Sequence, residues 1–158
     1  MRKNVVVTIY NSHPSFRADT ALRNLLRDCC CAIAAGEYEG ELFEVNLTFM
    51  DDSAIRKVNY DFRKIDNSTD VLSFPMSHCK TFYVNPATGL KMIGYILISA
   101  DNAFMQAADF GHSTKREFAY LTVHAMLHLF GYDHMTDEDR CKMRHKEEAV
   151  LEKLGLTR

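Results

Sequence analysis

HAMLHLFGYDH, residues 124–134, places three histidines on a strongly apolar segment that we expect to be helical. His124 and His128 are one helical turn apart, so both imidazoles project from the same face of the helix. Gly131 is a typical residue for a helix C-terminus, where the chain can reverse and return His134 to the first two rings. The spacing therefore predicts three imidazoles at one point, which is a ligand set for a divalent metal ion.

Zinc is the metal that three neutral imidazoles suit best, although ligand type alone does not exclude nickel, copper or iron. The same histidine spacing occurs in the zinc-peptidase motif H-E-x-x-H-x-x-G-x-x-H, but Ala125 stands where that motif has its glutamate. A zinc site with three protein ligands keeps one position for water and lowers the pKa of that water toward neutrality. Hydrolysis therefore does not require the missing glutamate, and we expect one Zn²⁺ per chain.

Two other interpretations of these histidines stay open. His124 and His128 can be hydrogen-bonded histidines in a helix interface, with Gly131 acting only as a helix cap. A closed structural site would instead need a fourth ligand, for which Cys141 and Asp133 are the candidates. Three histidines within eleven residues favour an open binding site over both alternatives.

The composition indicates a single domain, which we assign to residues 1–158. Of the 158 residues, 47% are hydrophobic and 25% charged, which is enough for one core. The formal charge of −2 gives no global basic field that would indicate nucleic acid, although a local basic groove is compatible with it. No run of eighteen apolar residues is present, and three of the five cysteines are adjacent. We expect a cytoplasmic protein with reduced cysteines.

Hydrophobic periodicity predicts an α+β domain with a mixed sheet of about four strands, about five helices and a zincin-like zinc site. Strands are expected at residues 5–10, 43–49, 69–76 and 93–99, with a loop or loose hairpin over 77–92. Helices are expected from Pro14 and Ser15 to Gly36, from 51–53 to about 62, from 99 to 111, from 114 to about 130, and from 136 to 155. Thr114 with Glu117 suggests a capping box, and Pro75 marks an edge strand or a strand end.

A second stretch, NYDFRKIDNSTDVLSFP at residues 59–75, adds a family likeness to residues 124–134. In order and spacing the two stretches resemble the YbeY family of metal-dependent endoribonucleases. That family's pattern is an arginine shortly before P-T-D-V-L-S-F-P, followed later by H-G-x-L-H-L-x-G-Y-D-H. The resemblance covers most of the chain, and implies that His124, His128 and His134 bind zinc and that Arg63 matches the family's functionally important arginine facing the metal.

The resemblance implies a zinc-dependent, single-strand-specific endoribonuclease of ribosomal RNA processing. The expected roles are maturation of the small-subunit RNA 3′ end and ribosome quality control. The expected partners are single-stranded RNA, ribosomal RNA, the small ribosomal subunit and assembly factors, whereas neither DNA nor a membrane is expected. We assign catalytic roles to Arg63 and His124. The guanidinium of Arg63 presents a planar fork of donors that matches phosphate oxygens, and an ordinary surface arginine at a helix end is the alternative.

Three positions depart from the family pattern. Ala125 replaces a glycine, Ser68 replaces a proline, and Tyr95 in GYILIS replaces an aspartate. The first two residues are small and we expect them to be tolerated. An acidic side chain at position 95 could orient water or a ligand near the cleft, and Tyr95 cannot do this.

Some residues near the two motifs have more than one plausible role. Asp70 can accept a hydrogen bond from a ligand histidine or cap a turn. Asp133 can orient water or carry a proton, although an ordinary turn residue is the favoured interpretation. Three aromatic residues near the expected cleft can stack on unpaired bases, but packing in the core or a loop is favoured; these are Phe74, Phe82 and Tyr83.

Two other functions are compatible with the motifs. A metal-dependent peptidase shares the histidine spacing, but the absent glutamate removes its usual water-activating group. A non-catalytic ribosome-assembly factor would use zinc only to stabilise its fold. Cleavage of RNA and not of protein would distinguish the nuclease from the peptidase. Loss of that cleavage when a histidine is replaced would distinguish it from the assembly factor.

Overall fold

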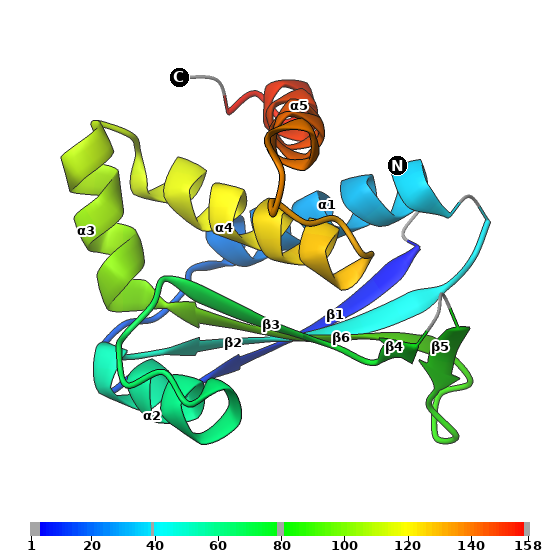
Figure 1. Ribbon diagram of the computed structural model, residues 1–158, viewed down its shortest axis with the longest axis horizontal. Helices are drawn as coiled ribbons and strands as arrows, with labels where there is room; N and C mark the ends of the chain where they lie inside the picture. Colours follow the sequence, from blue (N-terminus) through cyan, green and yellow to red (C-terminus); the bar gives the residue numbers. More distant parts are fainter. Residues whose placement is uncertain (1–3, 39, 79–80, 157–158) are drawn as a thin grey trace.

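A mixed β-sheet separates two unequal layers of helices (Figure 1). The computed structural model describes residues 4–38, 40–78 and 81–156. One face of the sheet carries α1 (Thr20–Glu37) and α4 (Thr114–Leu129), with α5 (Asp137–Lys153) above them. The opposite face carries α2 (Asp52–Arg63), and α3 (Ala100–Phe110) lies at one end. The predicted α+β fold class is confirmed.

The sheet is built around two long parallel pairings. Its strands are β1 (Val5–Asn11), β2 (Phe43–Met50), β3 (Val71–Pro75), β4 (Ser77–His78), β5 (Thr81–Val84) and β6 (Lys91–Ser99). β2 pairs in parallel with both β1 and β6. The other side of β6 pairs antiparallel with β3 at one end and with β5 at the other. Among the described strands β3 pairs only with β6, so it is an edge strand that ends at Pro75, as predicted.

The strict alternation of β2 explains the two helical layers. Phe43, Val45, Leu47 and Phe49 are fully buried in the large core that includes side chains of α1 and α4. On the opposite face Ile55 of α2 packs against Met50 and Leu72 in a smaller cluster. Because burying one large apolar side chain contributes roughly 1.5–3 kcal/mol, this alternation fixes the register of the central strand.

The start of α1 differs from the sequence prediction. The helix begins at Thr20, so the predicted start at Pro14 and Ser15 is wrong. The N–H groups of Ser15 and Phe16 donate to Nδ1 of His13, at 3.1 and 2.9 Å, and hold this segment in a turn. A side chain that binds the local backbone competes with helix formation, and here it delays the helix.

The predicted capping box of α4 is also wrong. The N-cap is Ser113, whose Oγ accepts a hydrogen bond from the N–H of Arg116 at 3.1 Å. Glu117 lies one position too far along the helix to close the box with Ser113, and its side chain is buried.

The segment 77–92 contains more regular structure than the predicted loop or loose hairpin. It includes β4, β5 and the first two residues of β6, and residues 79–80 lie outside the described part of the chain. Short strands of two to four residues carry too little periodicity to be recognised, and they form here because β6 offers an edge for pairing.

The cysteine triplet of α1 faces the interior. Cys29, Cys30 and Cys31 are buried and form no disulfide, as expected. Burial raises the pKa of Cys29 to about 12, so its thiol stays protonated and unreactive. None of the described helices combines the length and the apolar composition needed to cross a bilayer.

Gly94 allows the closest approach between β6, β3 and α4. A Cβ atom at this position would lie 2.3 Å from the carbonyl oxygen of Phe74 and 2.9 Å from Cδ2 of Leu129. Its φ angle of +155° is also one that side-chain-bearing residues rarely adopt. Glycine is therefore required for β3 and the C-terminal turn of α4 to pack on the same point of β6.

Replacing this glycine should separate the packed elements. We expect Gly94→Ala to lower the free energy of unfolding by about 3 kcal/mol, because the carbonyl of Phe74 belongs to the backbone and cannot move cheaply. Urea denaturation measures the change. The matched control is Gly36→Ala in α1, where a Cβ meets nothing within 4 Å, and we expect it to be neutral or stabilising by up to about 1 kcal/mol. Equal stability of the two variants would contradict this account of Gly94.

Candidate metal centre

α4 presents one polar stripe on an otherwise buried helix. Leu121, Val123 and Leu127 are buried in the core, whereas His124 and His128 are half-buried. The two histidines lie four residues apart, so their rings project from the same side of the helix toward solvent. Packing on the other sides of α4 thus fixes the direction in which both imidazoles point.

The turn after α4 returns the third histidine to the first two. The N–H of Gly131 donates to the carbonyl of His128 at 3.0 Å, and Gly131 has a φ of +99° that reverses the chain. The hydroxyl of Tyr132 donates to Glu37 of α1 at 2.8 Å and anchors the turn. His134 therefore approaches the helix from a fixed loop.

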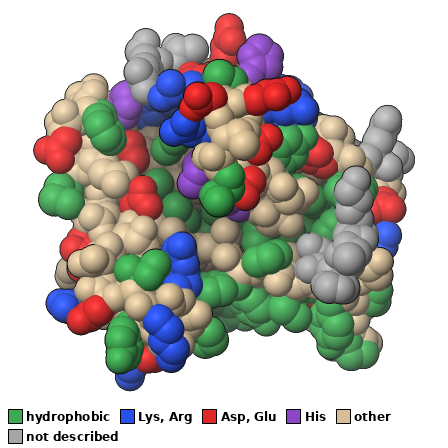
Figure 2. Space-filling model, viewed as in Figure 1, with side chains coloured by type: hydrophobic (Ala, Val, Ile, Leu, Met, Phe, Trp, Pro, Cys, Tyr) green, Lys and Arg blue, Asp and Glu red, His purple; other side chains and the backbone are tan. Residues whose placement is uncertain are grey.

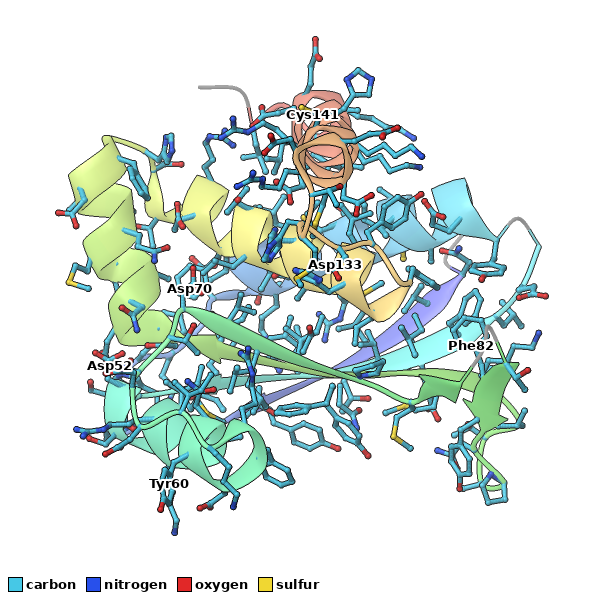
Figure 3. All side chains as sticks on the ribbon, viewed as in Figure 1. Asp52, Tyr60, Asp70, Phe82, Asp133 and Cys141 are labelled. Atoms are coloured by element: carbon cyan, nitrogen blue, oxygen red, sulfur yellow. The ribbon has the colours of Figure 1, made fainter. Side chains whose placement is uncertain are left out.

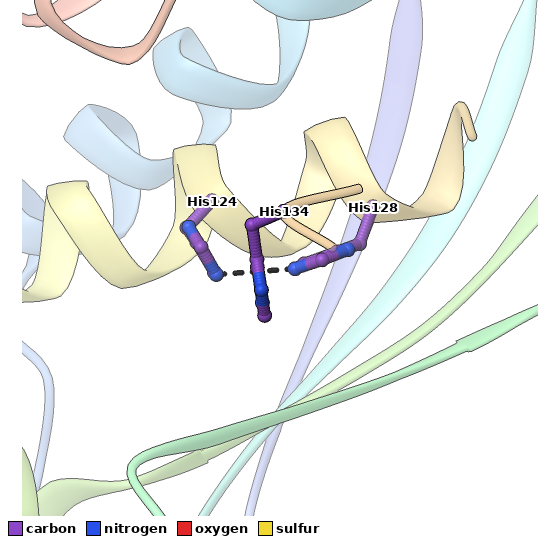
Figure 4. Close-up of side chains that lie close together, drawn as sticks. All are labelled: His124, His128 and His134. Carbon is purple, nitrogen blue, oxygen red and sulfur yellow. Dashed lines mark hydrogen bonds between the residues drawn. The ribbon is translucent and has the colours of Figure 1, made fainter. Parts of the chain in front are cut away.

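The three imidazoles converge (Figure 4). The Nε2 atoms of His124 and His128 are 3.1 Å apart, and one nitrogen from each of the three rings lies within 4.8 Å of the others. Metal–nitrogen bonds of 2.0–2.1 Å in a tetrahedral site require ligand nitrogens about 3.3 Å apart. The rings thus need only small rotations to share one ion, and the cluster fits a divalent metal.

Glu147 of α5 orients the first of these rings. Its Oε1 lies 2.7 Å from Nδ1 of His124, and its side chain is only 5% exposed. A carboxylate at this distance holds the proton on Nδ1, which leaves the lone pair of Nε2 free for a metal ion. We did not identify Glu147 from the sequence. The available signal was an acidic residue midway between Met143 and Leu151, two core positions of α5.

The surroundings keep His128 in its metal-binding form. Burial lowers the pKa of His128, and the neighbouring His124 and His134 lower it further. A hydrogen bond with the backbone of Tyr132 acts in the opposite direction without reversing the shift. The neutral imidazole, which is the form that coordinates metals, is therefore favoured.

The cluster has three protein ligands in the described part of the chain. Neither Cys141 nor Asp133 belongs to the group of mutually close ligand atoms, so the closed structural site is not supported. Figure 3 shows Asp133 in the turn beside α4 and Cys141 on α5. Asp133 accepts a hydrogen bond from the N–H of His134 at 2.7 Å, which is the role of a turn residue.

A cavity of about 650 Å³ between α4 and α5 borders two of the three histidines. His124 and His134 contribute to its wall together with Arg140 and Arg144 of α5. Figure 2 shows histidine side chains beneath the charged residues that gather over α5. A substrate in this cavity would therefore lie beside two of the three candidate metal ligands.

Asp70 does not contact the histidines. It lies at the start of β3 (Figure 3), where Oδ1 accepts a hydrogen bond from the N–H of Val71 at 2.8 Å. Its Oδ2 accepts one from Gln106 at 3.3 Å. Of its two possible roles, Asp70 has the local capping role, and Glu147 makes the carboxylate contact to a histidine.

Arg63 and Tyr95 belong to α2 and β6, elements other than those that carry the histidines. Arg63 is the exposed last residue of α2, and its side chain makes no hydrogen bond or ion pair with another described residue. Tyr95 pairs with Phe74 and lies two residues before Leu97 on β6. Phe74 and Leu97 both pack in the cluster on the α2 face of the sheet, so Tyr95 points to that face as well. Position 95 therefore faces away from α4, and its departure from the family pattern does not alter the surroundings of the histidines.

The aromatic residues considered for base stacking have different surroundings. Phe82 packs edge-on against Tyr38 and Phe43, with ring centroids 5.4 and 5.2 Å away, at the margin of the core (Figure 3). Phe74 contacts the ring of Phe62 at 5.5 Å. Tyr83 is exposed. Packing is thus the role of Phe82 and Phe74, as favoured from the sequence.

An α+β domain with an open three-histidine cluster on a core helix defines a candidate metal-dependent hydrolase. The family model described as endoribonuclease YbeY matches residues 8–155, so this chain belongs to the YbeY endoribonuclease family. The resemblance seen in residues 59–75 and 124–134 is thereby confirmed.

Individual relatives agree with this membership. Endoribonuclease YbeY of Caldicellulosiruptor saccharolyticus is 38% identical over 156 residues, covering 96% of this chain and 99% of the relative. Endoribonuclease YbeY of Caldanaerobacter subterraneus subsp. tengcongensis is 51% identical over 120 residues, covering 73% and 76%. The solution structure of TM1509 from Thermotoga maritima shares the fold, with a TM-score of 0.58 and 23% identity over 94% of this chain and 91% of that one.

The contact between Glu147 and His124 makes a prediction for metal binding. We expect Glu147→Gln to weaken the binding of divalent transition metals about tenfold or more, because the neutral amide no longer fixes the imidazole tautomer. Calorimetric titration of the metal-free protein measures this affinity. Glu152→Gln, an exposed position on the same helix, is the control and should bind like the parent. Unchanged affinity in both variants would show that Glu147 has no influence on the site.

Proposed function

We propose that this chain is a zinc-dependent, single-strand-specific endoribonuclease that acts in ribosomal RNA processing. The proposed substrate is the 3′ end of the small-subunit RNA, and the proposed partners are the small ribosomal subunit and its assembly factors. A role in ribosome quality control and a cytoplasmic location complete the proposal. The observation that carries it is the convergence of three imidazoles within 4.8 Å beside an open cavity, in a chain of an endoribonuclease family.

The residues of the chain divide the proposed chemistry among them. His124, His128 and His134 would hold zinc through ring nitrogens, and Glu147 would keep the proton of His124 on Nδ1. When bound, zinc would supply Lewis acidity and a water molecule of lowered pKa. The arginines of the cavity would attract the RNA backbone through phosphate contacts that depend on salt.

Arg63 has the proposed role of binding the scissile phosphodiester. Its guanidinium is exposed and makes no ion pair with a described residue, so it is available for an external anion. A planar fork of donors matches two phosphate oxygens and can stabilise negative charge that develops during cleavage.

The surroundings of Ala125 favour RNA over peptide as the substrate. Position 125 is only 1% exposed, and its side chain packs in the core instead of facing the cavity. The carboxylate that contacts a ligand imidazole, that of Glu147, is engaged by Nδ1 of His124. Neither residue offers the free carboxylate that the peptidase motif uses to activate water.

Substitutions in the two motifs should separate metal binding from phosphate binding. We expect His128→Ala to lose both bound metal and cleavage of a labelled unstructured RNA, because the ion loses one of three ligands. Arg63→Ala should keep the metal and lose about 100-fold or more in cleavage rate, as is typical when a donor to developing charge is removed. Metal analysis of each protein accompanies the rate measurements.

The matched control for Arg63 is Lys57→Ala, an exposed cation on the same helix, which should cleave at the parental rate. Equal cleavage by all four proteins would point to a contaminating nuclease and remove the support for a catalytic site. A parent that cleaves an unstructured protein and not RNA at the same zinc concentration would favour the peptidase. A metal-loaded parent without any turnover would favour the assembly factor.

The ribosomal substrate requires a separate test. Small-subunit particles that carry precursor RNA with an unprocessed 3′ end should be cut at one position near that end by the parent and not by His128→Ala. Sequencing of the RNA ends locates the cut. Indiscriminate degradation of these particles would contradict a role in 3′-end maturation.

A further inference from the structure

A second cavity continues the histidine cavity along α4. Its volume is about 320 Å³, and Tyr120 and Arg144 line both cavities. On α4, Glu117, Tyr120 and His124 follow one another at the spacing of a single helix face. The two cavities therefore form one groove, with the histidines at one end and Glu117 at the other.

The carboxylate of Glu117 is the unusual group of this second cavity. The side chain is only 2% exposed and makes no hydrogen bond with a described residue. Burial raises the pKa of Glu117, Asp70 raises it further, and Arg116 acts in the opposite direction. The guanidinium of Arg116, which lines the same cavity, is engaged by the carbonyl of Leu156 at 3.2 Å and the carboxylate of Glu148 at 3.5 Å.

No described group of the protein donates to this carboxylate, so the cavity suits a ligand that brings N–H groups. The carboxylate is an acceptor at both oxygens, and two adjacent donors on a planar ligand would satisfy both. The cavity volume is at the lower end of the range of roughly 300–1,000 Å³ that is usual for small-ligand pockets.

Two further side chains fit a nucleotide at this place. The ring of Phe110, at the end of α3, lines the cavity and is 65% exposed, so it offers a free face for stacking. Arg144 of α5 is exposed and makes no hydrogen bond or ion pair with a described residue. Its position between the two cavities is suited to a phosphate that links a nucleotide in one to a nucleotide in the other.

We propose that the second cavity binds a guanine base of the RNA substrate, next to the nucleotide that is cleaved at the histidines. This inference rests on the proposed endoribonuclease function. Guanine carries two adjacent donors, N1–H and the N2 amino group, which match the two oxygens of Glu117. Adenine, cytosine and uracil each place an acceptor beside their donor, and that acceptor would face the carboxylate. The base stacks on Phe110, and Arg144 binds the connecting phosphate.

The test is the cleavage of unstructured RNA oligonucleotides that differ only in the base at one position near the cut. We expect the parent to prefer guanine over adenine about tenfold or more at one fixed position, because a charged hydrogen-bond pair is lost with adenine. Inosine, which keeps N1–H but lacks the amino group, should be cut at an intermediate rate. In Glu117→Gln and Phe110→Ala the ratio of guanine to adenine cleavage should fall toward one.

Both variants have suitable properties for this test. Glu117→Gln keeps the volume of the side chain. Because burial raises the pKa of Glu117, the charged carboxylate is disfavoured in the folded protein, and replacing it with a neutral amide should not impair folding near neutral pH. Phe110 is exposed, and its removal leaves the core intact. The controls are Met105→Ala, exposed on α3, and Lys142→Ala, exposed on α5, which line neither cavity and should keep the parental preference.

The outcomes separate this inference from the proposed function. A parent that cleaves RNA without a preference for guanine, or whose preference survives in Glu117→Gln, overturns the guanine pocket and leaves the nuclease standing. A parent that cleaves none of the oligonucleotides overturns the nuclease. In that case calorimetric binding of guanosine 5′-monophosphate and adenosine 5′-monophosphate decides on the pocket. Equal affinity for the two nucleotides, or no difference between the parent and Glu117→Gln, overturns it.

Discussion

The burial of α4 is the constraint on which the rest of the molecule depends. The helix packs on the sheet and is flanked by α1, α3 and α5, so its apolar residues point into the core on most sides. The glycine at position 94 lets Leu129 approach β6 closely and fixes the end of the helix. Tyr120, His124 and His128 form a partly exposed stripe on one face of the helix. Functional side chains on a rigid element keep their geometry better than those on loops, and α4 supplies most of the groove in this way.

The other proposed functional groups lie on elements that polar contacts tie together. Asp101 of α3 accepts a hydrogen bond from the N–H of Asp52 at 3.1 Å, and thereby fixes the N-terminal end of α2. Asp52 in turn accepts hydrogen bonds from Ser99 at 2.5 Å and from Asn102 at 2.9 Å. The helix that carries Arg63 is thus attached to the helix that borders the second cavity, across the edge of the sheet.

Local patterns in the sequence predicted the parts of the structure that depend on local geometry. The four-residue spacing of His124 and His128, the reversal at Gly131 and the alternation of β2 need no knowledge of distant residues. Contacts between distant residues could not be predicted in this way. Glu147 meets His124 across 23 positions, and its role depends on how α5 packs over α4. Glu117 was predicted to be part of a capping box from its spacing to Thr114 alone. Its burial could not be predicted, because that burial comes from tertiary packing.

The ligand cluster and the sheet differ in how far apart their partners lie along the chain. β2 and β6 pair residues 43–50 with residues 91–99, so the central sheet closes a long loop before it gains any contacts. All three histidines fall within eleven residues, and a flexible chain can bring them together with little loss of entropy. An unfolded chain therefore retains part of its affinity for a metal ion. The ion would consequently protect the folded state against denaturation less than its binding constant suggests, and the apolar core must supply most of that resistance.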